Sequence, residues 1–200
     1  MGAKATGESS MGASKKPTWR RVVTYAYVLA ILVLARPEPP WFWVGFGISL
    51  PGMLLRMWAC GYLHKNKVLA TGGPYAHFKH PLYIGTFLGF LGFLVGVTTL
   101  HPPGSYLALA GFPVFFLVYF IYYLPKKNQV EKDRMLKRFG EEFLRWDREV
   151  PDFFPRLRPY KAGTPQRFQW SGLVRNSEIG MFGVYLAGWV FLFLRMRGLF

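Results

Sequence analysis

The chain has little that is reactive and little that is acidic. Cys60 is the single cysteine, so an internal disulfide is impossible and a catalytic thiol is not expected. Only ten acidic residues stand beside 25 lysines and arginines, which gives a formal charge of +15 at pH 7. The sequence contains no nucleophile motif, phosphate-binding loop, dinucleotide glycine fingerprint or paired-cysteine metal site. What remains is a strong positive charge, which is typical of proteins that contact nucleic acid or membranes.

Long apolar segments decide between these two partners. Hydrophobic residues make up 52% of the chain, and they gather in five segments. These segments are residues 22–35, 41–63, 82–100, 106–124 and 179–194. Three of them have the roughly 20 residues that cross a bilayer core, while the first and last are short. We therefore expect an all-α integral membrane protein with about five transmembrane helices.

The positive charge is distributed unevenly between the loops. Five lysines and arginines precede the first segment, three lie between the second and third, and thirteen lie between the fourth and fifth. This asymmetry predicts a cytoplasmic N-terminus and a multi-pass protein of a bacterial or archaeal inner membrane, or of the endoplasmic reticulum. The charge then needs no nucleic acid to explain it. Residues 1–18 are expected to be a disordered basic tail, and residues 19–200 a single domain.

A charged, amphipathic stretch follows the fourth apolar segment. Asn128 and Glu131 have the spacing of a helix capping box. Four apolar residues then share one helix face: Leu136, Phe139, Phe143 and Trp146. We expect a cytoplasmic helix that lies on the membrane with this face down, and Glu131 near the membrane boundary. Asp147 and most of its acidic neighbours are expected on a solvated, salt-bridged face.

A short polar loop separates the second and third apolar segments, and reads T-G-G-P-Y-A-H-F-K-H-P-L-Y-I-G over residues 71–85. Pro81 is suited to the first turn of a helix, which places His80 at its N-cap. The helix dipole, free N–H groups and Lys79 make this a suitable place for a ligand's carboxylate or phosphate. The alternative is a basic loop that only sets the membrane orientation.

Two other polar features within or near the spans have open interpretations. Arg56 lies inside an apolar segment, so it either has a functional partner or extends its side chain to the interface. His77 and His80 are three residues apart, but no carboxylate or thiol lies near them in sequence. We therefore expect no metal site.

Four sequence blocks carry a resemblance to a known family. They are L-L-R-M-W-A-C-G-Y-L, G-P-Y-A-H-F-K-H-P-L-Y-I-G, E-K-D-R-M-L-K-R-F-G-E-E-F-L-R-W and V-P-D-F-F-P. Together they resemble the isoprenylcysteine carboxyl methyltransferase family, which is related to the phospholipid N-methyltransferases. The resemblance covers residues 52–155 and does not extend to the last membrane helix, residues 178–195.

The resemblance implies a cytoplasm-facing site for S-adenosylmethionine. The residues that match the cofactor site are Gly73, Pro74, Tyr75, Lys79, His80, Pro81, Tyr83, Gly85 and Glu131. On this interpretation the catalytic residues are Glu131, Arg56 and Tyr83. Two positions depart from the family pattern, because Lys79 replaces an arginine and Lys132 replaces a second glutamate.

The expected function is methyl transfer from S-adenosylmethionine to a lipophilic acceptor, such as a prenylcysteine carboxylate or a lipid amine. The expected partners are therefore a lipophilic or lipidated substrate and membrane lipids. Two alternatives remain: an NADPH-dependent reductase of the sterol type, and a non-catalytic adaptor that binds anionic lipid.

Overall fold

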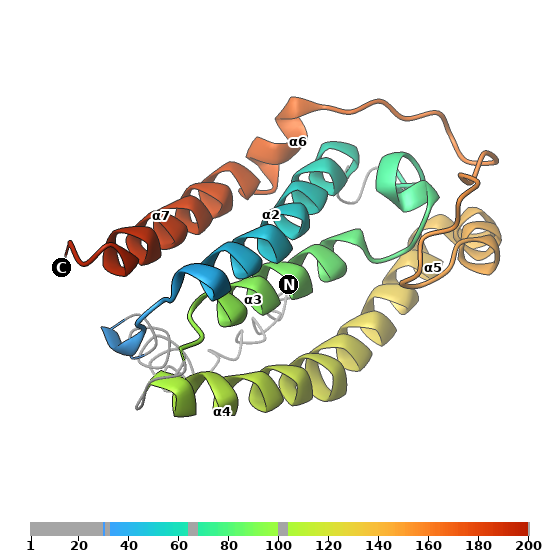
Figure 1. The fold of residues 1–200 in the computed structure, drawn as a ribbon. Coiled ribbons are helices and arrows are strands. Elements are labelled where there is room, and N and C mark those ends of the chain that lie inside the picture. Colours follow the sequence, from blue (N-terminus) through green and yellow to red (C-terminus); the bar gives the residue numbers. More distant parts are fainter. Residues whose placement is uncertain (1–29, 31–32, 64–67, 100–103, 200) are drawn as a thin grey trace, which may run out of the picture.

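The computed structural model describes residue 30 and residues 33–63, 68–99 and 104–199 (Figure 1). The predicted tail, residues 1–18, and most of the first expected span lie outside this part. Within the described residues every regular element is a helix, which confirms the all-α prediction.

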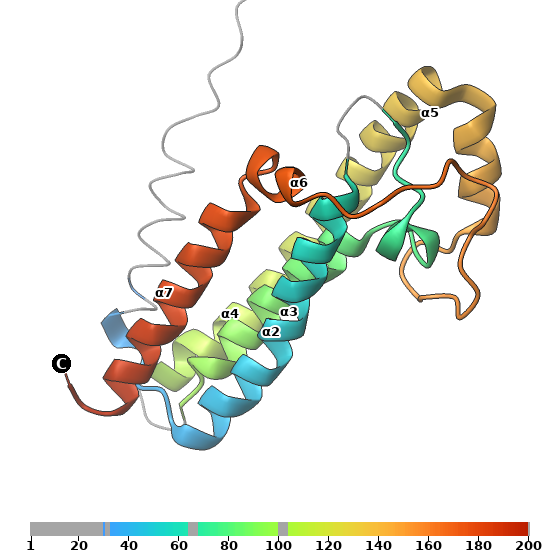
Figure 2. The same ribbon diagram turned by 90° about the horizontal axis from the view of Figure 1, so that it is seen from above.

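Helices α2 (Pro39–Tyr62) and α3 (Pro81–Gly96) lie side by side in both ribbon views (Figures 1 and 2). A Cβ atom added to Gly45 would lie 2.4 Å from the Gly92 carbonyl oxygen, and one added to Gly52 would lie 2.8 Å from the Gly85 carbonyl oxygen. The glycines thus let the two backbones come into direct contact, as small residues do in membrane helix pairs. We call the end at Tyr62 and Pro81 the loop end, and the opposite end the far end.

Helix α7 (Glu178–Met196) follows the short helix α6 (Trp170–Arg175) and runs along α2. A chain of polar contacts joins the two long helices: Tyr185 and Ser49 share a hydroxyl hydrogen bond of 2.7 Å, and Trp189 Nε1 donates to Ser49 Oγ at 3.0 Å. At the far end Arg195 Nε donates to the Ala35 carbonyl at 2.6 Å. Side-chain hydrogen bonds of this kind hold helices together where lipid gives no hydrophobic force between them.

The expected start of the amphipathic helix at Asn128 is wrong. Helix α4 (Gly104–Phe116) continues through a π-helical stretch, η2 (Leu117–Tyr123), into α5 (Leu124–Glu149). A capping box needs a helix end, and here the preceding turns already supply backbone acceptors to the N–H groups. The real interruption is Gly140, whose φ of 50° and ψ of −123° break α5 into two parts.

The apolar face of α5 does not lie on a membrane surface along its whole length. Phe143 and Trp146 are 4% and 6% exposed and pack against Leu69, Ala70 and Tyr75 in the protein's own core. Leu136 alone of the four predicted residues is clearly exposed, at 44%. The amphipathic pattern does mark the face that is buried, but this face packs against the loop between α2 and α3 where a membrane was predicted.

Residues 151–169 form a strap that returns from α5 to α6 across this loop. Lys79 N donates to the Pro151 carbonyl at 2.9 Å, and Tyr160 N donates to the Ala76 carbonyl at 2.9 Å. Gln166 Oε1 accepts from the backbone N–H groups of Thr71 and Gly72 at 3.1 and 3.0 Å. The strap therefore supplies hydrogen-bond partners to an irregular loop that cannot pair within itself.

Two of the described helices, Pro39–Tyr62 and Glu178–Met196, are long and apolar enough to cross a membrane. Helix α3 and the stretch 110–121 are apolar but shorter. The predicted topology of five spans is thus not confirmed, although four of the five expected segments do form helices.

Candidate functional site

The loop between α2 and α3 begins with a tight turn at the loop end. Gly73 has φ of +55°, and a Cβ atom there would lie 2.5 Å from the ring of Tyr62. Pro74 opens η1 (Gly73–Ala76), a single turn of 3₁₀-helix. Gly73 and Pro74 therefore shape the turn that carries the next residue, Tyr75, into the core.

Tyr75 is a buried side chain whose hydroxyl lacks a hydrogen-bond partner in the part of the chain that the structure describes. The residue is 7% exposed, and no hydrogen-bond partner for its hydroxyl occurs among the described residues. Its backbone carbonyl accepts a hydrogen bond of 3.0 Å from Trp146 Nε1, which fixes its place. Burial raises the pKa of the Tyr75 hydroxyl, and the negative charge of Glu131 raises it further. The group is thus a neutral donor that is available to a ligand.

His80 and Pro81 open helix α3 as the sequence predicted. The His80 ring stacks on Tyr83 with centroids 5.2 Å apart, and lies 5.5 Å from the ring of Phe153. Its Nε2 atom is buried, has no hydrogen-bond partner in the described part of the chain, and lies 4.0 Å from Asp152 Oδ1. Burial lowers the pKa of His80 against the opposing effect of Asp152, so the imidazole is neutral at pH 7.

Lys79 is already paired within the protein. Its ammonium lies 2.7 Å from Asp147 Oδ1 and 3.1 Å from Asp152 Oδ1, and its side chain is 7% exposed. Burial alone would raise the pKa of Asp152, but the bond and charge of Lys79 hold that pKa below its ordinary value. Lys132 approaches Asp147 at 3.6 Å. Asp147 is thus a salt-bridged residue as expected, but it joins α5 to the site loop.

Glu131 and Tyr83, two of the predicted site residues, are in direct contact. Tyr83 donates its hydroxyl hydrogen to Glu131 Oε2 at 2.5 Å, and the Tyr119 hydroxyl donates to the Tyr83 carbonyl. Phe87 and Phe115 pack against these two tyrosines. A carboxylate is thereby held at the edge of an aromatic cluster between α3, η2 and α5.

Arg56 has a partner that the sequence interpretation missed. Its guanidinium forms a two-pronged ion pair with Glu178 of α7, with Nε 3.3 Å from Oε2. Its Nη1 donates to Thr86 Oγ1 and to the Leu82 carbonyl, the latter at 3.3 Å. A Cβ atom on Gly85 would lie 2.5 Å from Arg56 Cγ, so this glycine makes room for the arginine. Arg56 therefore joins α2, α3 and α7, and does not reach out to an interface.

One signal in the sequence pointed to Glu178. It is one of the few acidic residues outside residues 131–152, and it opens the last apolar segment. A buried arginine in an apolar helix requires a counter-charge at similar depth. Gln166 and Asp152, which hold the loop and Lys79, carried no comparable signal.

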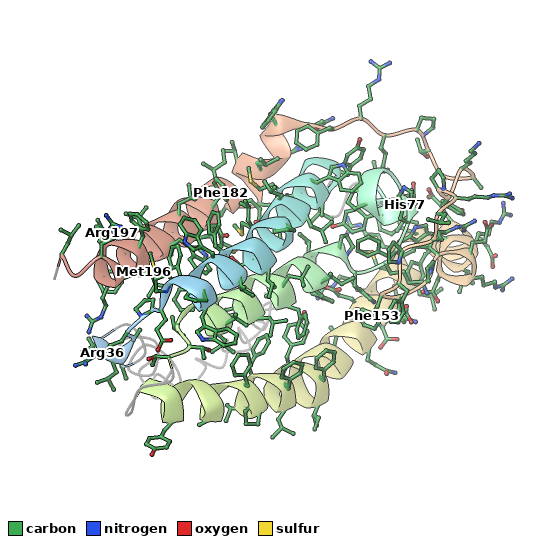
Figure 3. All side chains as sticks on the ribbon, in the orientation of Figure 1. Arg36, His77, Phe153, Phe182, Met196 and Arg197 are labelled. Carbon is green, nitrogen blue, oxygen red and sulfur yellow. The ribbon has the colours of Figure 1, made fainter. Side chains whose placement is uncertain are left out.

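The predicted site residues thus fall into three groups. Tyr75, His80, Tyr83 and Glu131 lie at the loop end, where Tyr83 and Glu131 bond to each other and the Tyr75 hydroxyl and His80 Nε2 lack a partner among the described residues. Gly73, Pro74, Pro81 and Gly85 shape the backbone, while Lys79 and Arg56 are engaged in ion pairs of the protein itself. In Figure 3 the labelled His77 and Phe153 lie on this side of the molecule, opposite Arg36 and Arg197. Across the described residues, no three His, Cys, Asp or Glu side chains gather as a metal site.

The fold and the site together define a helical protein with apolar helices of membrane-spanning length and a buried charged and aromatic cluster at one end. No family model matches the chain, and no solved structure matches it significantly. The chain is 35% identical over 168 residues to the cobalt-zinc-cadmium resistance protein CzcN of Cupriavidus metallidurans, which covers 79% of this chain and 71% of the relative. It is 33% identical over 167 residues to the nickel-cobalt-cadmium resistance protein NccN of Alcaligenes xylosoxydans xylosoxydans, covering 79% and 72%. The chain belongs to this family of metal-resistance proteins.

This relationship corrects the expected function. Methyl transfer to a lipophilic acceptor is wrong as a prediction, because relatives over most of the chain are named for resistance to cobalt, zinc, cadmium and nickel. The reductase and the lipid adaptor are likewise not what the relatives are named for. The resemblance to methyltransferases and the binding of S-adenosylmethionine stay predictions.

Proposed function

We propose that the protein contributes to resistance against divalent transition-metal cations, with cobalt and cadmium as the first candidates. The observation that carries this proposal is the similarity to CzcN and NccN over more than two thirds of their length. Cobalt and cadmium are the two metals that both names share.

The site supports an indirect part in resistance. Thiolates, imidazoles and carboxylates are the usual ligands of such cations, and the described residues offer no group of three. The buried Lys79 ammonium between Asp147 and Asp152 also opposes a cation there. The Tyr75 hydroxyl and His80 Nε2, which have no hydrogen-bond partner among the described residues, instead favour a small polar ligand.

The proposal also covers the ligand of the site and the orientation of the protein in the membrane. S-adenosylmethionine, expected from the resemblance, is a candidate ligand that a binding measurement tests independently of any reaction. The multi-pass arrangement with the loop end in the cytoplasm is supported by the lysines and arginines, which concentrate in the segments at this end.

Growth of the source organism without this gene tests the proposal. We expect the deletion strain to grow less than wild type on cobalt and on cadmium, and equally well on sodium chloride. Complementation with the wild-type gene restores growth, while Tyr75→Phe and His80→Ala restore less. Tyr106→Phe is the matched control, because Tyr106 is 66% exposed. Equal growth of wild type and deletion strain on both metals would overturn the proposal.

A ligand titration measures binding at the site independently of the growth phenotype. Calorimetry of the purified full chain with S-adenosylhomocysteine tests the predicted cofactor, and calorimetry with Co²⁺ tests direct metal binding. We expect no Co²⁺ binding at micromolar affinity. Tight Co²⁺ binding that His80→Ala abolishes would show that the site holds the metal itself.

A further inference from the structure

The outer face of α6 is an apolar surface that the site does not use. Trp170 is 74% exposed and Val174 is 66% exposed, and the two residues lie four apart on one face of the helix. On the inner face, Gly172 and Leu173 are buried, and a Cβ atom on Gly172 would lie 2.4 Å from the Cys60 carbonyl oxygen. Helix α6 is therefore fixed firmly to the end of α2 while it presents a tryptophan outward.

The position of α6 places this surface at a membrane boundary. The helix connects the strap to α7, and Ser177 is the only residue between Asn176, its C-cap, and the start of α7. Gln169 N donates to the Gly61 carbonyl at 2.9 Å, so α6 starts beside the last turn of α2. Figure 2 shows α6 at the top of α7, next to the end of α2. Both neighbours have the length and composition of membrane-spanning helices.

Positive charge accompanies the apolar face. Arg167, three residues before α6, and Arg175, the last residue of α6, are exposed, and Arg175 Nη2 donates to Gln169 Oε1 at 3.2 Å. The segment 151–176 contains five lysines and arginines and one acidic residue, Asp152, which Lys79 neutralises. A guanidinium is well matched to phosphate, and tryptophan favours the depth of lipid headgroups.

We propose that α6, with Arg167 and Arg175, is an interfacial surface that binds the headgroups of anionic phospholipids. Trp170 and Val174 enter the boundary between headgroups and acyl chains, and the two guanidinium groups contact lipid phosphates. This surface holds the junction of the strap and α7 at the membrane, next to the Arg56–Glu178 ion pair. The inference rests on the multi-pass placement proposed above.

Site-directed fluorescence quenching tests this proposal on the full chain. Val174→Cys is prepared in a Cys60→Ala background, labelled with an environment-sensitive fluorophore, and reconstituted in vesicles that contain brominated phosphatidylglycerol or brominated phosphatidylcholine. We expect quenching by both lipids, and stronger quenching by phosphatidylglycerol at equal mole fraction. Arg167→Gln with Arg175→Gln lowers this preference by about fivefold for each arginine, the effect of roughly one surface cation.

Matched variants make each outcome decisive. Arg36→Gln with Arg197→Gln removes two exposed cations from the far end and leaves the preference at position 174 unchanged. A probe at Leu54, which is 51% exposed in α2, reports membrane placement separately. Quenching at position 54 without quenching at 174 overturns the α6 proposal alone, and means that water or a protein covers this face. Absence of quenching at both positions overturns the membrane placement as well.

Discussion

The two ends of the α2–α3 pair are held together by different means. At the far end, Phe42 and Phe46 of α2 place their rings 5.2 and 5.3 Å from the ring of Trp189 in α7, and Gly45 meets Gly92 backbone to backbone. At the loop end, ion pairs join the elements: Arg56 with Glu178, and Lys79 with Asp147 and Asp152.

This difference between packing and ion pairs indicates that the loop end is the part of the molecule built for a function. Close packing suffices to join apolar helices, so the far end needs no buried ion pair. Buried ion pairs recover little more than their cost of desolvation, and they are destabilising when one partner is lost. Charges concentrated at the loop end, together with a Tyr75 hydroxyl that has no partner within the described ranges, thus indicate a site that has a task beyond holding the helices together.

The largest expected effect comes from breaking the ion pair at the loop end. Glu178→Ala leaves the Arg56 guanidinium buried without its counter-charge, so we expect the free energy of unfolding to fall by about 3–5 kcal/mol. Denaturant titration of the purified protein in detergent measures this loss. The double variant Arg56→Met with Glu178→Met removes both charges and loses much less. Equal losses in the single and double variants would contradict the pairing.

A smaller effect is expected from breaking the packing toward the far end. In Gly92→Ala, the new Cβ lies 2.5 Å from Ser49 N, so the helices must separate and stability falls by about 1–3 kcal/mol. The matched control is Gly89→Ala in the same helix, where nothing lies within 4 Å of the added atom. This control is neutral or stabilising, since alanine favours a helix over glycine. Thermal unfolding measures both variants. Equal melting temperatures for Gly92→Ala and Gly89→Ala would contradict the close packing at Gly92.

A smaller, pH-dependent effect on stability is expected from His80 at the loop end. The pKa of His80 is lowered by burial, so below about pH 6.5 the unfolded chain binds a proton that the folded chain does not. Stability therefore falls as the pH drops from about 6.5 toward the folded pKa, and is fully present above that range. His80→Gln removes this slope while Gly89→Ala retains it, as melting temperatures between pH 5 and 7.5 will show. An unchanged slope in His80→Gln would mean that another group titrates.

The smallest effect on stability is expected at Tyr75. Its hydroxyl has no hydrogen-bond partner among the described residues, so Tyr75→Phe removes a buried polar atom without breaking a bond. We expect a melting temperature that is equal to or slightly above that of the wild type, together with the reduced metal resistance predicted above. A strong loss of stability would show that the hydroxyl is bonded inside the fold and is not available to a ligand.

Much of the local structure followed from the sequence because its causes are local. The apolar segments predicted helices, and Pro81 and His80 marked the start of α3. Each of these inferences uses a preference that acts within one or two turns of chain. The capping box at Asn128 failed for the same reason, since a capping motif cannot act where the helix has already started.

The partners of the buried charges depended on how the helices pack. The sequence shows that Arg56 needs a counter-charge, but Glu178 is 122 residues away and ten acidic residues were available. Lys79 was expected to meet a ligand, and the strap and α5 instead bring two aspartates to it. The apolar face of α5 was predicted to lie on the membrane, but Phe143 and Trp146 on this face pack against the loop between α2 and α3. Periodicity shows which side of a helix is buried, and the folded chain alone sets the element that covers it, because long-range contacts depend on the packing of the whole chain.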